Sequence, residues 1–301
     1  MHRALLTALL FASACTVKGN FDTPDADPDH PFPPPRTDLV PALGSETTLE
    51  IACWNIENFP ASAATTPGRV ADVIASLDLD VVIVEEIADE TAWEQLLARL
   101  PEHEGVLSTH RYTPDEYQKI GIIYRSSLVT VGAPTLLFPS DSYTFPRPPF
   151  SIPITVDGNT IELVGVHLKA GGGDEDEARR TAAIIALDNH LRAQVDGGGE
   201  AEVVVLGDYN QRIVADDERV AFAPLLSAPE RYTVRTEALA AAGRYTYLGF
   251  GGELIDHLTT TAALDARWTG AHVEIPQLDQ LVPGYRGDIS DHLPVVLVTP
   301  R

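Results

Sequence analysis

The sequence predicts an α/β (α+β) domain in which mixed β-sheets are flanked by helices. Two observations carry this prediction. Strand-like and helix-like segments alternate from Leu49 onward without an internal linker, which is the pattern of layered sheets and helices. In addition, Asp157-Gly158-Asn159 separates the apolar segments 152–156 and 160–168, which is a hairpin signal. A hairpin pairs its strands antiparallel, so a purely parallel sheet is excluded.

The first elements follow from the spacing of apolar residues. Over 49–53 these residues alternate with polar or small ones, which predicts a strand. Over 70–77 they recur at helical spacing, and the apolar run 81–84 that follows is typical of a buried strand. The chain therefore begins its folded part with a strand, a helix and a second strand.

The later elements follow from a helix-start signal and from further apolar runs. Thr91 and Glu94 have the spacing of a capping box and predict a helix that ends near Leu100. The remaining segments are a helix over 175–195, a buried strand over 203–206 and late strands over 253–261 and 294–298. Because no linker interrupts this series, we expect one domain over 48–301.

The N-terminus has the features of an export signal. His2 and Arg3 precede an apolar run, 4–14, that is too short to span a bilayer but has the length of a signal-peptide core. The run ends in Ala12-Ser13-Ala14-Cys15, which resembles the bacterial lipobox. We expect a signal peptide over 1–14 and a membrane anchor through lipid on Cys15, hence an extracytoplasmic lipoprotein or a secreted protein. A cleaved soluble signal or a buried N-terminal helix is the alternative.

The segment after the export signal is typical of a tether. Residues 16–47 contain seven prolines and four closely spaced aspartates, so we expect an extended spacer over 15–47. Cleavage before Cys15 and attachment of lipid to its sulfur would leave Cys53 as the single free thiol. An intrachain disulfide would then be excluded. Cys53 lies in an apolar strand pattern and is expected to be a small buried hydrophobe rather than a nucleophile.

Composition and charge exclude several classes of protein. With 44% hydrophobic and 22% charged residues, the chain is neither disordered nor fibrous. Its formal charge of −23 excludes a domain-wide basic surface and therefore affinity for nucleic acid through massed phosphate contacts. A bound divalent cation reverses the sign of the field at its site, so an acidic enzyme can still act on polyanions.

Several strand-like segments end in polar residues that folding alone does not require. These residues are Asn55 and Glu57, Glu85 and Glu86, His167, Asp208 and Asn210, and Asp291 and His292, with Asp256 in a further segment. Each has a structural alternative, such as a turn, an edge salt bridge, a hydrogen-bonded core position or an Asx turn. Together they offer oxygen ligands for Mg²⁺ or Mn²⁺, two histidines for proton transfer and an aspartate to orient one of them.

The order of these fragments resembles the endonuclease/exonuclease/phosphatase superfamily, the fold of secreted deoxyribonucleases, sphingomyelinases and inositol polyphosphate phosphatases. The matching motifs are Trp54–Glu57, Glu86, His167-Leu168, Gly207–Asn210, Ile255-Asp256 and Ser290–His292. The resemblance covers about Leu49 to Val298. It implies a four-layer sandwich of two packed mixed β-sheets flanked by helices.

The resemblance also implies a metal site. Asn55 and Glu86 match its residues, Asp291 matches a contributor and Glu57 is a further candidate. The cofactor implied is Mg²⁺ or Mn²⁺, and binding of Ca²⁺ stays open. Gly171 to Gly173 lack the Lys-Ser/Thr ending of a phosphate-binding P-loop, so no nucleotide cofactor is expected.

The same resemblance implies the groups that move protons. Asp208 matches the residue that orients or deprotonates the attacking water, and Asn210 matches one that holds the phosphate or the metal. His292 and Asp256 match the family's His-Asp pair. His167 matches the second histidine of the secreted nucleases and phosphatases.

One departure concerns the partner of this second histidine. Some secreted nucleases place a Glu just before the strand that reads Ile120 to Tyr124 here, whereas this chain has Gln118 at the nearest position. The tuning of His167 as an acid or a base therefore stays open.

The expected activity is metal-dependent phosphodiester hydrolysis by an extracytoplasmic nuclease, a monomer whose substrate partner is nucleic acid. The alternatives are a phosphomonoesterase or a sphingomyelinase-like lipid phosphodiesterase, and a catalytically silent surface-binding module. Aromatic residues in 138–153 could touch lipid, stack on bases or pack onto the body. Lys169, Arg179 and Arg180 adjoin an acidic helix start and could meet a phosphate, although helix capping also explains this segment.

Overall fold

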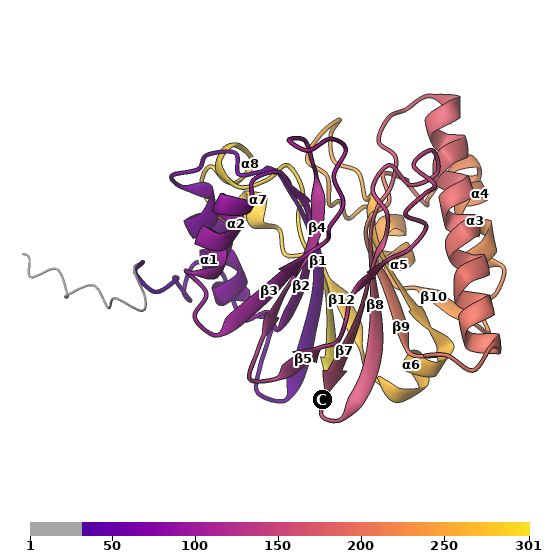
Figure 1. Cartoon of the computed structure of the whole chain (residues 1–301), viewed down its shortest axis with the longest axis horizontal. Helices are drawn as coiled ribbons and strands as arrows, with labels where there is room; N and C mark the ends of the chain where they lie inside the picture. The colour runs from indigo at the N-terminus through magenta and orange to yellow at the C-terminus, as the bar shows by residue number, and fades with distance from the viewer. Residues whose placement is uncertain (1–31) are drawn as a thin grey trace, which may run out of the picture.

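The computed structural model describes residues 32–301 (Figure 1). The predicted signal peptide, the lipid anchor at Cys15 and the first half of the predicted tether lie outside the described residues. Across residues 32–301, every helix is either too short or too polar to cross a membrane.

One sheet has six strands and is mixed. Its strands are β1 (Thr48–Phe59), β2 (Val81–Ile87), β3 (His103–Leu107), β4 (Lys119–Arg125), β12 (His272–Glu274) and β13 (Val295–Pro300). They lie in the order β12-β13-β1-β2-β4-β3. β1 and β2 are parallel, with helix α1 (Thr66–Leu77) between them in the chain, and the other neighbours are antiparallel. The first strand, helix and strand are therefore confirmed.

The second sheet is also mixed. Its strands are β5 (Val129–Val131), β6 (Thr135–Leu136), β7 (Phe150–Val156), β8 (Asn159–His167), β9 (Val203–Asp208), β10 (Tyr232–Val234) and β11 (Asp256–Thr261). The order is β10-β11-β9-β8-β7-β5, and β6 pairs with β7. β8 and β9 form the parallel pair and flank helix α3 (Asp174–Asp196) in the chain.

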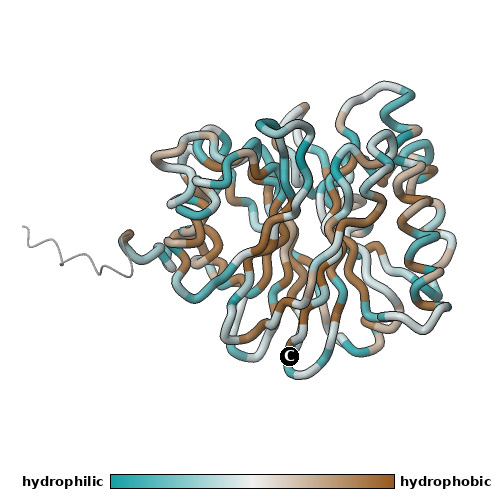
Figure 2. Tube along the Cα trace, in the orientation of Figure 1, coloured by the Kyte–Doolittle hydropathy of each residue, from teal (hydrophilic) through white to brown (hydrophobic). Residues whose placement is uncertain are grey.

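The two sheets pack face to face, with helices on the outside (Figure 1). Helices α1 and α2 (Glu90–Leu97) cover the six-stranded sheet, and α3 and α4 (Asp216–Leu226) cover the other. Short helices fill connections: α5 (Glu237–Ala241), α6 (Ala262–Arg267), α7 (Leu278–Leu281) and α8 (Tyr285–Asp288). Apolar residues concentrate in the strands and polar ones in the loops (Figure 2). The predicted sandwich of two mixed sheets flanked by helices is confirmed.

The hairpin joins β7 to β8 through a two-residue turn. Asp157 and Gly158 both have positive φ, at 50° and 81°, which is the conformation that matches the twist of the flanking strands. Val156 and Asn159 pair directly across the turn. The predicted hairpin is thus confirmed, and the turn is one residue shorter than the Asp157-Gly158-Asn159 signal.

The predicted capping box of α2 is wrong. Asp89 is the N-cap, and its carboxylate accepts hydrogen bonds from the backbone N–H groups of Thr91 and Ala92 at 2.7 and 3.0 Å. A carboxylate two or three residues before free N–H groups satisfies them directly. Helix α2 therefore starts at Glu90, before the expected cap, and ends at Leu97 rather than near Leu100.

The end of the predicted tether packs onto α1. Ser76 accepts a hydrogen bond from the N–H of Leu39 and donates one to the carbonyl of Arg36, at 3.1 and 2.9 Å. The side chain of Val40 is buried, and the N–H of Leu43 bonds to the carbonyl of Leu77. The folded body therefore begins before residue 48. Cys53, in β1, is buried as expected, and burial raises the pKa of its thiol.

Candidate active site

The predicted site residues meet in one cleft at the end of the sandwich where the parallel strands of both sheets terminate. Its volume is about 650 Å³. The predicted residues that line it are Glu57, Glu86, His167, Asp208, Asn210, Asp291 and His292. Asn55 and Asp256 are buried just behind them and hydrogen-bond to lining residues. The structure therefore brings all nine together.

Irregular backbone at the strand ends turns side chains into the cleft. Glu57, Asn58, Glu86 and Asn210 all have φ between 42° and 64°, a region that residues other than glycine seldom adopt. The pairing of β1 with β2 shifts register after Asn55, and that of β2 with β4 shifts before Ile87. Such bulges re-aim side chains beside active sites.

The bulge separates two neighbouring glutamates. Glu85 pairs in register with Asn55, is fully buried between the sheets and has no hydrogen-bond partner for either carboxylate oxygen. Burial raises the pKa of Glu85 well above its ordinary value, and the nearby Asp256 and Asp208 carboxylates raise it further. Glu86 follows on the twisted backbone and lines the cleft. Of the two carboxylates, Glu86 is therefore the one that meets a ligand.

Asn55 links the two sheets. Its amide donates to Asp208 Oδ2 at 3.1 Å and to Glu86 Oε1 at 3.3 Å, and its oxygen accepts from the N–H of Glu57 at 3.0 Å. Expected as a metal ligand, Asn55 is engaged here in holding two acidic side chains in place. Asn210 holds Asp208 from the other side through its backbone and side-chain nitrogens, at 2.7 and 3.1 Å.

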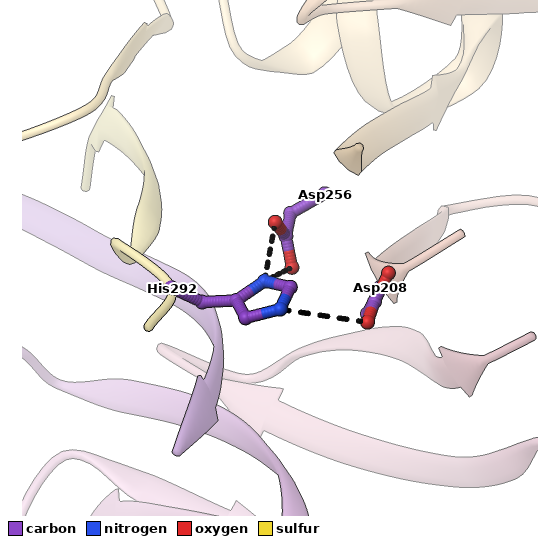
Figure 3. Close-up of side chains that lie close together, drawn as sticks. All are labelled: Asp208, Asp256 and His292. Atoms are coloured by element: carbon purple, nitrogen blue, oxygen red, sulfur yellow. Dashed lines mark hydrogen bonds and ion pairs between the residues drawn. The ribbon is translucent and has the colours of Figure 1, made fainter. Parts of the chain in front are cut away.

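His292 and Asp256 form the expected pair (Figure 3). Asp256 Oδ2 lies 2.9 Å from Nδ1 of His292, and Asp208 Oδ2 lies 4.0 Å from its Nε2. The main chain of His292 is fixed as well: its N–H donates to Ser290 Oγ, and its carbonyl accepts from Trp54 and Tyr285. His292 therefore presents one nitrogen to Asp208 with little freedom to move.

The charges in this cluster shift the pKa values of His292 and Asp208. Burial alone would lower the pKa of His292, but the Asp256, Asp208 and Asp291 carboxylates outweigh it and raise that pKa to about 10. Burial raises the pKa of Asp208 to about 7, with a further contribution from Asp256, although His292 and the bonds from Asn210 and Asn55 oppose it. Near neutral pH the cluster thus joins a charged imidazolium to a carboxylate poised to exchange a proton.

His167 is neutral and enclosed. Its Nε2 lies 3.6 Å from both Glu86 Oε1 and Asp208 Oδ2, and its Nδ1 is buried without a partner. Burial, followed by the positive charges of Arg147 and His292, lowers the pKa of His167 well below its ordinary value. Gln118 bonds to Asn58 and Arg147 rather than to His167. Among residues 32–301, no glutamate takes the position of the expected partner.

One wall of the cleft is acidic. Glu57, Glu86 and Asp291 line it together, and burial followed by mutual repulsion raises the pKa of Glu57. Burial likewise raises the pKa of Asp291. Carboxylate oxygens are the ligands that Mg²⁺ and Mn²⁺ prefer. These three residues of the cleft therefore offer the kind of ligand that the expected cation takes.

Within residues 32–301, Asp208, Asp256 and His292 come within 4.8 Å of one another, close enough to hold a metal ion, whereas Glu57, Glu86 and Asp291 do not form a group this tight. The hydrogen bonds already described engage Nδ1 of His292 and both oxygens of Asp208. This cluster is accordingly better suited to proton transfer than to metal binding.

Some lining residues had no motif to signal them. Tyr247 packs its ring 4.9 Å from that of His292, and Phe250, 91% exposed, stands at the rim between glycines. Of the aromatic residues in 138–153, Phe145 and Phe150 are buried and Tyr143 is exposed. The expectation that this segment packs onto the body therefore holds for Phe145 and Phe150. Arg180, weighed from sequence as a phosphate ligand, lines the cleft, whereas Lys169 pairs with Asp176.

Comparison with known proteins agrees with this geometry. A family model, the Endonuclease/Exonuclease/phosphatase family, matches residues 52–292. No curated protein matches the chain. Among solved structures, D. rerio TDP2 complexed with single strand DNA product has a TM-score of 0.61 and 18% identity, covering 85% of this chain and 100% of that chain.

Two bacterial structures are similar to the same extent. The endonuclease/exonuclease/phosphatase from Bacteroides vulgatus has a TM-score of 0.62 and 19% identity, covering 84% of this chain and 99% of that chain. The 3' phosphatase NExo from Neisseria, bound to product DNA hairpin, has a TM-score of 0.60 and 18% identity, covering 83% and 98%. With the family match across most of its length, the chain belongs to the Endonuclease/Exonuclease/phosphatase family of phosphoester hydrolases.

Proposed function

We propose that the protein is a divalent-metal-dependent phosphodiesterase that hydrolyses nucleic acid. The observation that carries the proposal is the placement of Asp208 between the His292–Asp256 pair and His167, facing an acidic wall. Hydrolysis of a phosphodiester needs an activated water, neutralisation of the negative charge on the phosphoryl oxygens and a proton for the leaving oxygen. Residues of this cleft can meet each need.

Glu86, Glu57 and Asp291 would hold the cation, with Asn55 keeping Glu86 in place. A bound divalent cation supplies positive charge to the phosphoryl oxygens. The three carboxylates make that end of the cleft negative, so without a cation they would repel a phosphate. This explains how a chain of charge −23 can accept a polyanion.

Asp208 accepts the proton of the attacking water. The pKa of about 7 keeps a useful fraction ionised at neutral pH while leaving the group basic enough to take a proton. His292, charged and fixed by Asp256, stabilises the phosphoryl oxygens through its Nε2–H and gives that proton to the leaving oxygen. His167, uncharged, lies 3.6 Å from Asp208 and offers a second ring nitrogen to the phosphoryl group.

Nucleic acid is the substrate best supported. TDP2 and NExo, two proteins of similar fold, were captured with a DNA product. Phe250 exposes its ring at the rim of the cleft, where it could stack on a base. The burial of Phe145 and Phe150 removes most of the aromatic surface that would favour a lipid substrate.

We also propose that the enzyme acts outside the cytoplasm, anchored through Cys15. The support is the apolar run that ends in Ala12-Ser13-Ala14-Cys15. Metabolic labelling with a palmitate analogue should label the full chain and fail to label the Cys15→Ser variant. Equal labelling of both chains would overturn the anchor.

The activity is tested by nicking of supercoiled plasmid. We expect the purified full chain to nick plasmid with Mg²⁺ or Mn²⁺ and to stop when EDTA is added. His292→Ala should slow cleavage by about 10² to 10⁴ because the imidazolium is lost. His272→Ala is the matched control, since that histidine is exposed on β12, and it should cleave as the wild type does.

Two results would contradict the proposal. If the plasmid stayed intact with every divalent ion, nucleic acid would be excluded as the substrate. A phosphomonoester or a lipid phosphodiester would then be the leading candidate. Equal rates for His292→Ala and wild type would remove His292 from the mechanism.

A further inference from the structure

Arg180 is a buried charge in the wall of the cleft. It lies near the start of α3, is 6% exposed and lines the same cleft as Asp208 and Asn210. The other arginines nearby differ from it. Arg212 is largely exposed and pairs with Glu218 and Glu253, and Arg179 is half-buried and bonds to the carbonyl of Tyr143.

The protein gives Arg180 only neutral hydrogen-bond partners. Nε donates to Gln211 Oε1 at 2.8 Å, and Nη1 donates to the carbonyls of Lys169 and Gly171 at 3.0 and 2.7 Å. Within residues 32–301 these three bonds occupy Nε and Nη1 and leave Nη2 without an acceptor. The three bonds also fix the orientation of the group.

Arg180 has no carboxylate partner in the described part of the chain. No carboxylate oxygen there lies within 4.0 Å of its nitrogens, and Asp176, one turn before it, pairs with Lys169 at 2.9 Å. Arginine stays charged in proteins, and a buried charge is costly unless it is paired. In a chain with 44 acidic residues, the missing partner indicates that a negative group from outside the chain takes this place.

The loops after β8 and β9 hold Arg180. Its acceptors Lys169 and Gly171 lie two and four residues past His167, and Gln211 lies three residues past Asp208. His167 and Asp208 are partners in register at the ends of β8 and β9. Arg180 is therefore held by the segments that follow these strand ends, rather than by the strand ends that carry the reacting groups.

We infer that Arg180 binds a second phosphate of the substrate, next to the one that is hydrolysed. This inference rests on the proposed nuclease function and deepens it, because a substrate with one phosphate would leave Arg180 unpaired. The free Nη2 can donate to a phosphate oxygen while the guanidinium charge faces the phosphate, and the neutral bonds of Nε and Nη1 hold the group ready. The enzyme should therefore prefer a nucleic acid strand or a phosphorylated end to an isolated phosphodiester.

The inference is tested with matched dinucleotides in the presence of Mg²⁺ or Mn²⁺. Thymidylyl-thymidine has one phosphate, and its 5'- and 3'-phosphorylated forms have a second on either side. We expect the wild type to favour one phosphorylated form at least tenfold in kcat/KM. Arg180→Gln should abolish that preference, and Arg179→Gln should keep it. Equal selectivity in Arg180→Gln and wild type would overturn the inference, as would no preference in the wild type.

A binding measurement separates this inference from the proposed activity. Fluorescence anisotropy of a labelled single-stranded oligonucleotide with Mg²⁺ needs no turnover. We expect Arg180→Gln to bind at least tenfold more weakly, with a salt dependence of log Kd that is smaller by about 0.7, one phosphate contact. Matching thermal unfolding midpoints, or rescue by Arg180→Lys, would exclude a folding defect. Unchanged affinity and salt dependence would overturn the second phosphate site even if the enzyme cleaves nothing.

Discussion

At the scale of single residues, adjacent glutamates have opposite environments. Glu85 is fully buried, and neither of its carboxylate oxygens has a partner, whereas Glu86 lines the cleft. Both follow the same apolar strand, and the difference comes from the positive φ of Glu86. A one-residue change in backbone direction therefore decides which carboxylate can meet a cation.

These two residues provide a matched test of the metal site. Glu86→Gln removes a charged oxygen from the acidic wall, so we expect the Mg²⁺ concentration for half-maximal rate to rise at least tenfold. Glu85→Gln replaces a protonated carboxyl by an amide of similar shape and should leave that concentration within about threefold of the wild type. Metal titrations of the plasmid-nicking rate measure both. If Glu85→Gln raised the Mg²⁺ requirement and Glu86→Gln did not, Glu85 rather than Glu86 would be the metal ligand.

Another buried carboxyl lies at the far end of β1. Glu50 is 1% exposed, next to Asp80, and its Oε1 has no partner. Burial, together with the neighbouring Asp80 and Asp78 and against a hydrogen bond from Thr48, raises the pKa of Glu50 to about 8. Arg125 pairs with Asp78 and Asp80 rather than with Glu50. Glu50 therefore stays protonated in the folded protein at neutral pH.

This shift makes a prediction about stability. A carboxyl whose folded pKa is raised stabilises the fold below about pH 4.5, and that contribution is lost as pH rises toward 8. Glu50→Gln cannot ionise in the unfolded chain, so it avoids the loss. We expect equal unfolding midpoints for variant and wild type near pH 4.5 and a higher midpoint for the variant at pH 8. A difference that does not change with pH would contradict this.

At the scale of elements, β8 and β9 approach so closely that one position between them must be glycine. Gly207, directly before Asp208, has φ of 140°. A Cβ there would clash with the carbonyl of Val166 and lie 2.8 Å from Glu85 Oε1. The close approach lets His167 and Asp208 end side by side. The glycine thus sets the spacing of two site residues.

Alanine substitutions at Gly158 and Gly207 separate the cost of the close approach from the cost of the backbone conformation. Gly158→Ala in the hairpin turn meets no atom within 4 Å, so it costs only the left-handed backbone, about 1–2 kcal/mol. Gly207→Ala adds a clash worth about 1–3 kcal/mol, for roughly 2–5 kcal/mol in all. Denaturant unfolding of both variants measures the difference. Equal losses would mean that β8 and β9 move apart at little cost.

At the scale of the whole molecule, the charge of −23 opposes a polyanionic substrate everywhere except at the cleft. Long-range repulsion acts over about 30 Å at 0.01 M salt and about 8 Å at 0.15 M. Local contacts through the cation and Arg180 act at short range. The two effects respond to salt in opposite directions.

We therefore expect kcat/KM for a single-stranded oligonucleotide to rise as NaCl increases from 0.01 to 0.15 M at constant free Mg²⁺. Screening of the repulsion speeds encounter, while the few phosphate contacts weaken little. An unphosphorylated dinucleotide, with one charge, should respond less. A steady fall for the oligonucleotide over the same range would show that attraction dominates instead.

Much of this protein follows from its sequence alone. Apolar periodicity specified the long central strands and the helices α1 and α3, because each of these elements needs a face to bury, whereas short edge elements such as β5, β10 and β12 went unpredicted. The Asp157-Gly158 turn excluded a purely parallel sheet, since only a hairpin fits that signal. Polar residues at the ends of apolar strands marked the site, and the nine residues predicted to form it lie together. Local patterns were sufficient wherever the cause was local.

Tertiary structure decided what depends on residues far apart in the chain. Asn55 proved to hold Asp208, 153 residues away, because two sheets meet there. The Asp89 cap of α2 is an exception, because its contacts with Thr91 and Ala92 are local and the sequence offered two neighbouring candidates for the helix start. The choice of Glu86 over Glu85 and the lack of an acidic partner for Arg180 depend on burial and on neighbouring charges. The spacing of residues in the sequence reports neither burial nor neighbouring charges. Both depend on which distant segments pack against a residue in the folded chain.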